Sequence, residues 1–373
     1  MADLMRILIR VLLFSVLLLG TPLLGIWLAG KPVAAYLAFP PRTGQVGHAS
    51  FSWNVFVVDS LLALAFFTWM LCLLIPRRRQ EKESAHGHET RAFPAWGWMS
   101  LAELILFWWL AWTRQPWFAF FEPHTFTPLW LGYIVFINAV TWKRTGRSLL
   151  THRTGYFLSL FPVSALFWWY FEFLNRFIEN WHYVGIEAFG PFRYALHATL
   201  AFSTVLPAVI STREWLASWS RLGQGGCRPR WSIRHPRLLA GLVLVLSGVG
   251  LLGLGVRPDV LYPLVWVAPL LLIVSLQVLT GSPTLLDRTG DPWRLIALSM
   301  LAALLCGFLW EMWNYYSQAK WVYTVPFVQR FHLFEMPLLG YTGYLPFGIE
   351  CAVVADLVDR ALEKKDGQVL ESR

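Results

Sequence analysis

The chain has 373 residues, of which 56% are hydrophobic and only 14% are charged, and its mean hydropathy is +0.50. Soluble domains contain roughly 45 to 50% apolar residues, so a soluble core does not account for this excess. The net charge of +9 comes from short basic clusters between apolar runs. That pattern is typical of a membrane topology signal, and we expect membrane lipid rather than nucleic acid as the partner.

Apolar runs of about 18 or more residues recur along the chain, and each can cross a hydrocarbon layer of roughly 30 Å. They predict an all-α, polytopic bundle of about ten transmembrane helices. The predicted helices lie near residues 7–29, 54–76, 96–113, 125–142, 156–178, 193–212, 238–255, 261–280, 295–314 and 341–360. The first run is longer than the apolar core of a signal peptide, which is roughly 7 to 15 residues, so we expect it to be retained.

The basic residues test this helix count, because they should gather in alternate loops on the cytoplasmic side of the membrane. Most of the Lys and Arg residues fall on one side of the predicted bundle, including the basic stretch between Arg213 and Arg237. The sequence therefore predicts a plasma or inner membrane protein with both termini in the cytoplasm.

A self-match links the fifth and ninth predicted helices. Leu-Leu, then one or two residues, then Arg-Thr-Gly precede each helix, at residues 149–155 and 285–290. Each helix ends in Glu-x-x-Asn, and Trp-x-Tyr follows it. The two helices are four crossings apart and so point the same way. We therefore predict a parallel internal duplication that relates helices three to six to helices seven to ten. Chance similarity between two aromatic-rich helices is the alternative.

The predicted duplication divides the chain into five parts. Residues 1–95 hold two helices and a basic cytoplasmic loop, 96–212 the first repeat, 213–237 a basic cytoplasmic linker, 238–360 the second repeat, and 361–373 a cytoplasmic tail.

The repeated acidic and amide side chains are the candidate catalytic residues. Glu172 and Asn175, like Glu311 and Asn314, are three apart and share a helix face. An ionisable residue inside a bilayer costs roughly 2.5 to 3.5 kcal/mol and normally faces the bundle interior or a cavity. A carboxyl that desolvation keeps neutral could donate a proton, and the Asn could orient it. In the alternative interpretation, Asn and Glu only join helices through a hydrogen bond.

Two further acids precede or enter the last predicted helix. Glu335 is a third catalytic candidate, and Glu350 is a candidate for substrate binding. The prolines and glycines in residues 334–350 predict a re-entrant or broken segment that lines a cavity, whereas an ordinary loop that leads into a helix is the alternative.

Aromatic residues around the repeated acids are candidates for substrate binding, because rings in a dry pocket can stabilise a cation by about 2 kcal/mol or more. They are Trp168, Trp169, Trp181, Tyr183, Trp310, Trp313, Trp321 and Tyr323. An interfacial aromatic belt is the alternative explanation for many of the aromatic residues.

The cysteines show no CxxC and no Cys/His spacing that suits zinc. We therefore predict neither a disulfide framework nor a metal centre. The chain also lacks a phosphate-binding loop, a nucleophile elbow and dinucleotide-binding glycines, so no cofactor is expected.

These features favour a membrane enzyme that protonates a double bond of an isoprenoid or polycyclic lipid, as a cyclase, isomerase or hydratase would. The architecture is similar to that of the small membrane-bound lycopene cyclases, which are also built from repeated helical units with intramembrane acids. Their paired-carboxylate motif after a proline is absent from this sequence. A proton-coupled transporter of a small or lipidic solute, and a non-catalytic assembly or sensory component, are the alternatives.

Overall fold

The computed structural model describes residues 16–41, 45–76, 91–229, 233–288 and 290–371, with side chains described through residue 363. The described chain is mostly helical, with two short two-stranded ribbons. Among these residues, 7 helices are long and apolar enough to cross a membrane, or 8 if one bent pair is a single span. The protein is therefore a multi-pass helical membrane protein.

The candidate spans agree in position with most of the predicted helices. Single helices form four of them: α4 (Trp53–Leu74), α8 (Thr154–Ile178), α11 (Pro236–Gly253) and α14 (Pro292–Tyr315). A fifth, Leu338–Glu363, joins α15 (Tyr344–Glu371) to the turn that precedes it. Another span is α6 (Phe126–Thr145) with the preceding turn η4 (Glu122–His124). A further span is interrupted and consists of α9 (Pro191–Phe202) and α10 (Val205–Ala217). In the bent pair, α12 (Pro258–Leu261) and η5 (Tyr262–Trp266) meet α13 (Ala268–Thr280) at 53°.

Two predicted helices account for most of the difference from about ten. The predicted helix at 7–29 lies partly outside the described residues, and its described part is short, as η1 (Val16–Gly20) and α2 (Thr21–Leu28). The helix predicted at 96–113 is present as α5 (Ala95–Thr113). It is not among the apolar spans because its tryptophans and Glu103 lower its hydropathy.

The remaining helical elements are short and connect the long helices. They are α3 (Val33–Leu37), η3 (Pro116–Phe118), α7 (Leu149–His152), η6 (Leu285–Asp287) and η7 (Leu338–Gly343).

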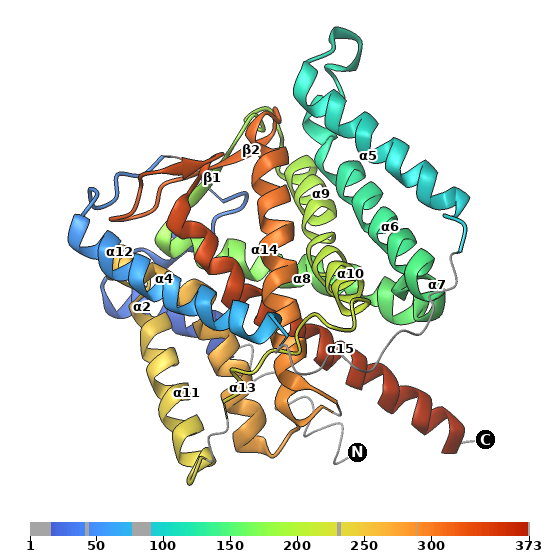
Figure 1. The fold of residues 1–373 in the computed structure, drawn as a ribbon. Coiled ribbons are helices and arrows are strands. Elements are labelled where there is room, and N and C mark those ends of the chain that lie inside the picture. The colour runs from blue at the N-terminus through green and yellow to red at the C-terminus, as the bar shows by residue number, and fades with distance from the viewer. Residues whose placement is uncertain (1–15, 42–44, 77–90, 230–232, 289, 372–373) are drawn as a thin grey trace.

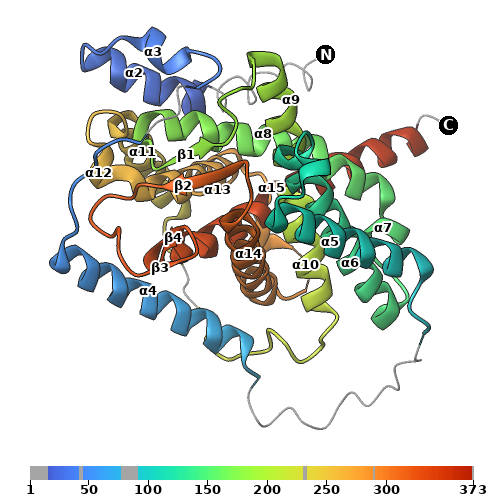
Figure 2. The same ribbon diagram turned by 90° about the horizontal axis from the view of Figure 1, so that it is seen from above.

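The helices are arranged around a central pair. In Figure 2, α14 and α15 lie between α5 and α6 on one side and α11 and α13 on the other. The helices α5 and α6 pack together, as do α11 and α13, and α15 packs on α14 and α8. Large apolar side chains of the central helices are buried, whereas α4 and α11 expose many of theirs, as expected where helices face lipid.

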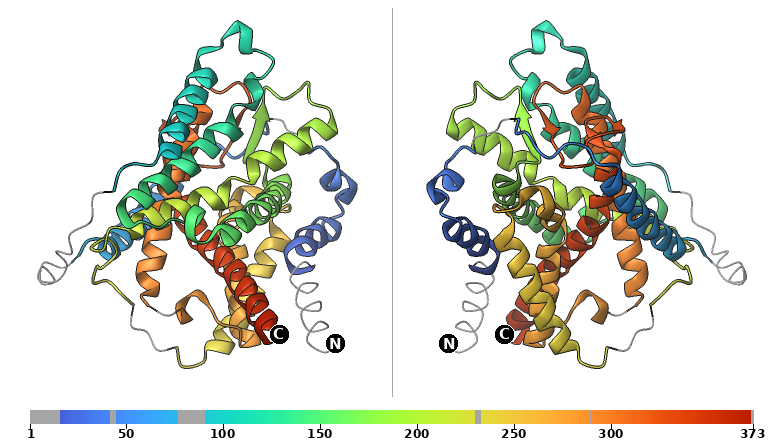
Figure 3. Two further views of the ribbon diagram at one scale, coloured as in Figure 1. Left: turned by 90° about the vertical axis from the view of Figure 1, so that its right-hand side faces the viewer. Right: turned by 90° about the vertical axis from the view of Figure 1, so that its left-hand side faces the viewer.

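An antiparallel ribbon of β1 (Trp181–Val184) and β2 (Lys320–Tyr323) follows the ends of α8 and α14. It lies at the end of the bundle opposite the last turns of α15 (Figures 1 and 3). In its register, Trp181 opposes Tyr323 and Tyr183 opposes Trp321. The Trp of each Trp-x-Tyr segment therefore lies opposite the Tyr of the other segment.

The segment at 334–350 is irregular at its start and then leads into a helix, and residues 338–363 form one candidate span. A short ribbon of β3 (His332–Leu333) and β4 (Met336–Pro337) leads into η7, and regular α-helix begins only at Tyr344. Gly340 and Gly343 lie in η7, and Pro346 falls in the first turn of α15, where proline is tolerated.

The turns that precede α8 and α14 are built alike. Ser148 and Thr151 form a capping box around α7, and Thr284 and Asp287 form one around η6. The arginine that follows each capping box, Arg153 or Arg288, forms an ion pair with the same carboxylate, Asp359 of α15. One acidic residue therefore ties together the starts of the two matched helices.

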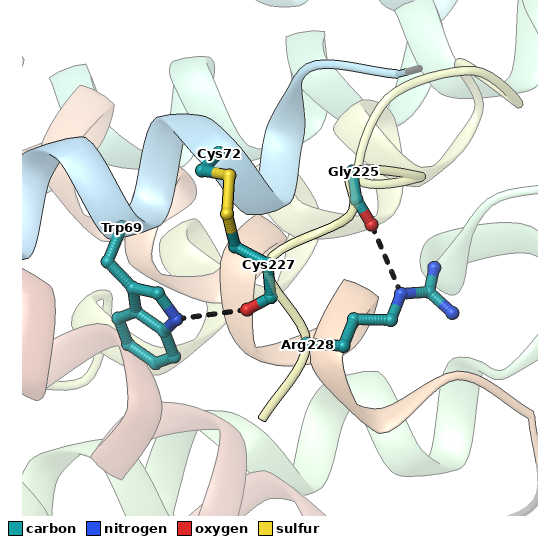
Figure 4. Close-up of a disulfide and its surroundings, with 5 residues drawn as sticks. All are labelled: Trp69, Cys72, Gly225, Cys227 and Arg228. Atoms are coloured by element: carbon teal, nitrogen blue, oxygen red, sulfur yellow. Dashed lines mark hydrogen bonds between the residues drawn. A yellow bond between two sulfur atoms is a disulfide. The ribbon is translucent and has the colours of Figure 1, made fainter. Parts of the chain in front are cut away.

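The structure corrects the prediction of no disulfide framework, because it contains a disulfide. Cys72 at the end of α4 is bonded to Cys227 in the segment after α10, with their Cα atoms 5.6 Å apart (Figure 4). Trp69 donates a hydrogen bond to the Cys227 carbonyl at 3.3 Å. The two cysteines are 155 positions apart in sequence, and only the approach of this segment to α4 brings them together.

A glycine permits that approach. A Cβ added at Gly225 would lie 1.9 Å from the Cys72 carbonyl oxygen, so only glycine fits there. The Gly225 amide then donates to the Leu73 carbonyl at 2.8 Å.

The start of the predicted basic linker 213–237 differs from the prediction, because residues 213–217 are helical and continue α10.

Candidate functional site

Glu172 lies in the last third of α8 and its carboxyl is buried. Three donors converge on its Oε1 atom: Trp168 Nε1 at 3.2 Å, Trp181 Nε1 at 3.0 Å and the Tyr183 hydroxyl at 2.6 Å. Trp168 precedes Glu172 by one helical turn, and β1 supplies the other two. Donors that are 4, 9 and 11 residues away in the sequence therefore satisfy a buried acid, as a dry interior requires.

Glu311 occupies the corresponding place in α14 and is completely buried. The Tyr323 hydroxyl donates to its Oε1 atom at 2.8 Å and the Tyr344 hydroxyl does so at 2.9 Å. Its Oε2 atom has no hydrogen-bond partner among the described residues. The two carboxyls thus differ in how fully they are hydrogen-bonded.

The two asparagines hold the strands rather than the carboxyls. Asn175 donates to the Trp181 carbonyl at 2.7 Å and accepts from the Trp181 amide at 3.3 Å. Asn314 makes the same two bonds to Trp321, at 2.8 and 2.9 Å. The expectation that Asn orients its neighbouring Glu directly is therefore wrong. Each amide positions the strand whose aromatic residues contact the Glu.

The residues around Glu172 and those around Glu311 meet at one aromatic cavity of about 110 Å³. Six of the predicted substrate-binding residues line it: Trp168, Trp181, Tyr183, Trp310, Trp321 and Tyr323. The Glu172 and Glu311 carboxyls accept hydrogen bonds from residues of this lining and lie behind it. A ligand in the cavity would therefore meet tyrosine hydroxyls and ring faces first, with each carboxyl one hydrogen bond further away.

The tyrosine hydroxyls of the ribbon keep their protons at neutral pH. Burial raises the pKa of Tyr183 well above its usual range, and the charge of Glu172 adds to this effect. Burial likewise raises the pKa of Tyr323, with Glu311 as the second cause. Both hydroxyls are thus proton donors to the acids behind them.

The other predicted residues lie outside this lining. Trp169 donates to the Thr199 hydroxyl at 3.0 Å, and the Trp313 ring packs 4.9 Å from that of Trp130. Glu335 forms an ion pair with Lys320, and the lysine lines the cavity. Glu350 is 1% exposed, and neither of its carboxyl oxygens has a partner within the described chain.

Among the lining residues that were not anticipated as site residues are Tyr194, His197, Trp266 and Tyr344. One sequence signal could have found Tyr344. Tyr344-Leu-Pro346 in α15 is similar to Val205-Leu-Pro207 in α10. The number of residues from Val205 to Tyr344 equals the number from Glu172 to Glu311. Both Val205 and Tyr344 line the cavity. Trp266 lies at the bend before α13, and no local pattern marks it.

The described residues contain no group of three or more His, Cys, Asp or Glu side chains that could hold a metal ion. No protein-family model matches the sequence, and it has no match among curated proteins or solved structures. The arrangement of the site is therefore the basis for assigning a function.

Proposed function

We propose that this protein is a membrane enzyme that isomerises or cyclises an isoprenoid or polycyclic lipid by acid-initiated carbocation chemistry. We also propose that two copies of a four-helix unit, in helices three to six and seven to ten of a ten-helix chain, each supply one half of the site. The protein would lie in the plasma or inner membrane with both termini in the cytoplasm.

One observation carries this proposal: two buried carboxyls from matched helices converge on a single aromatic cavity. Glu172 reaches the lining through Tyr183, and Glu311 reaches it through Tyr323 and Tyr344. The rings of Phe171 and Trp266 stack at 5.2 Å in the same cluster. Ring faces of this kind stabilise a cation in a desolvated site, and they are already in place before charge develops.

The hydrogen bonds suggest different roles for the two acids. Three donors on Oε1 of Glu172 suit a carboxylate, because hydrogen bonds to the charged form favour it. Glu311 accepts two, and its Oε2 atom, unpartnered among the described residues, is the natural place for a proton. We therefore assign Glu311 as the acid and Glu172 as the base.

The reaction balances without a cofactor. For transfer, the protonated oxygen of Glu311 turns to donate to a tyrosine hydroxyl, and that hydroxyl passes its own proton to one carbon of a substrate double bond, so that a carbocation forms at the other carbon. That cation is either moved along the chain or attacked by a second double bond to close a ring. Loss of a neighbouring proton to Glu172 through Tyr183 then restores a double bond, no electrons are gained or lost, and proton exchange with water returns both carboxyls to their starting states.

A transporter is the second candidate, and broken helices favour it. The α9–α10 span is interrupted next to the cavity, and the α12–α13 pair is bent by 53°. Transporters often form their binding sites from discontinuous helices of repeated units. A carrier would move its ligand unchanged, which separates the two functions experimentally.

The test compares lipid extracts, by mass spectrometry, from cells that make the wild type, Glu172→Gln or Glu311→Gln. We expect an altered isoprenoid profile for the wild type and loss of that alteration in both variants. Glu187→Gln is the matched control, because Glu187 is exposed and outside the cavity lining. An identical profile with and without the wild-type protein would reject the enzymatic function, and pH-dependent uptake into proteoliposomes would then support the carrier.

A further inference from the structure

A chain of three hydrogen-bonding side chains reaches the cavity from the α9 side. Arg193 Nη2 lies 3.0 Å from His124 Nε2, and His124 Nδ1 lies 3.1 Å from His197 Nδ1. His197 lines the aromatic cavity. Phe189 stacks on His124, with the ring centroids 5.6 Å apart, and the Arg193 guanidinium lies 4.1 Å over the Phe189 ring. The chain is thus held in place by packing as well as by hydrogen bonds.

The direction of these hydrogen bonds follows from the arginine. A guanidinium has only donors, so His124 Nε2 must accept and carries no proton. The proton of neutral His124 is then on Nδ1, from which it is donated to His197 Nδ1. His197 therefore carries its own proton on Nε2. The result is a neutral imidazole that offers an N–H donor from the cavity wall.

Tyr194 supplies a second donor on the same helix face, because it precedes His197 by three residues in α9. Its side chain is only 5% exposed and lines the cavity. The hydroxyl has no hydrogen-bond partner among the residues that the structure describes. A buried hydroxyl without a partner is unfavourable, so an acceptor that a ligand brings to it would be stabilised.

We infer that the cavity binds the oxygen-bearing edge of a lipid end group, whose one hydrogen-bond-accepting carbonyl or ether oxygen is held by His197 Nε2 and the Tyr194 hydroxyl. This rests on the proposed function and narrows its substrate to an oxygenated isoprenoid. At about 110 Å³ the cavity is smaller than an engineered cavity of roughly 150 Å³ that holds benzene, so only this edge enters it, and the rest of the end group and the chain lie outside. A pure hydrocarbon would leave both donors unpaired.

The test uses two matched probes, isophorone and the trimethylcyclohexene that lacks its carbonyl oxygen. Binding to the full protein in lipid nanodiscs is followed by the fluorescence of the cavity tryptophans. We expect the wild type to bind isophorone at least tenfold more tightly, because a site built around hydrogen-bond donors rejects an analogue without the acceptor. Each variant is compared with the wild type using the same probe, so partition of the probe into lipid cancels.

Tyr194→Phe and His197→Phe should each weaken isophorone binding by about fivefold, as expected for the loss of one hydrogen bond, and should leave the hydrocarbon unchanged. Tyr170→Phe is the matched control, because the Tyr170 hydroxyl is also buried and unpartnered among the described residues but lies outside the cavity lining. His124→Phe tests the relay: it should lower the preference for isophorone without removing a group from the cavity.

Equal wild-type affinity for the two probes would overturn the inference, as would an unchanged preference in both the Tyr194 and His197 variants. These outcomes differ from a failure of the proposed chemistry. If the probe preference is found but the Glu172 and Glu311 variants leave the lipid profile unaltered, the oxygen-binding site is retained and the enzymatic step is rejected.

Discussion

Gly307 of α14 packs directly against the ring of Tyr344, and a Cβ added to the glycine would lie 2.4 Å from Tyr344 Cδ2. Gly307 precedes Glu311 by four residues, as Trp168 precedes Glu172. In α8 the tryptophan itself donates to the carboxyl, whereas in α14 the glycine leaves room for a tyrosine of α15 that does so. The two matched acids therefore have donors from different elements.

Gly307→Ala should displace Tyr344 and break its 2.9 Å hydrogen bond to Glu311. Overpacking of this kind costs roughly 1 to 3 kcal/mol, and we expect that loss in the free energy of unfolding measured in detergent. Gly248→Ala in α11 is the control, because its added Cβ would meet no described atom within 4 Å. Equal stability of the two variants would show that Tyr344 is not held against Gly307.

Asn175→Ala should loosen β1, because the Trp181 amide and carbonyl both lose their bonds to the asparagine. Buried polar groups left unpaired cost roughly 1 to 3 kcal/mol, so we expect a loss of that size in the free energy of unfolding. Asn180→Ala is the matched control: this asparagine is equally buried, and its Oδ1 atom has no partner among the described residues. Similar losses for the two variants would contradict the positioning role of Asn175.

The turn at η6 should open in acid. Hydrogen bonds from the Thr284 backbone and hydroxyl hold the pKa of Asp287 below its usual 3.8. Because the folded pKa is lowered, the capping bonds stabilise the turn above that value and are lost as the pH falls through the lower, folded pKa. Hydrogen exchange of residues 284–288, corrected for the intrinsic rate, should therefore increase below about pH 4.

The similar turn before α8 is an internal control for that experiment. Ser148 and Thr151 make its capping box without an acid, so exchange of residues 148–151 should not follow the same titration. Parallel changes in the two turns would point to general unfolding instead of protonation of Asp287.

Cys72 and Cys227 lie at the end of the bundle that the basic residues assign to the cytoplasm, where disulfides are rare. We expect this pair to be reduced in the cell and to form its disulfide on oxidation. Acid quenching of intact cells, denaturation and thiol labelling should then count 4 reactive cysteines, since Cys306 and Cys351 are free. If only Cys306 and Cys351 are labelled, the end of the bundle that carries Cys72 and Cys227 lies on the oxidising side of the membrane. The predicted orientation is then reversed.

Local patterns of the sequence determined the membrane class and much of the site. Apolar length and punctuation located most of the spans and the break before Tyr344, because these properties depend on neighbouring residues. The Glu-x-x-Asn and Trp-x-Tyr patterns located six aromatic residues of the lining in the same way.

Tertiary structure decided what these residues contact. The Cys72–Cys227 bond, the attachment of Asn175 to β1, and the arrival of Tyr344 at Glu311 all depend on how separated segments pack. The convergence of Glu172 and Glu311 on one cavity requires the pairing of β1 with β2, whose residues are far apart in the chain. Hydropathy and periodicity act over a few helical turns, whereas such contacts are chosen only when the whole bundle excludes lipid and water from its interior.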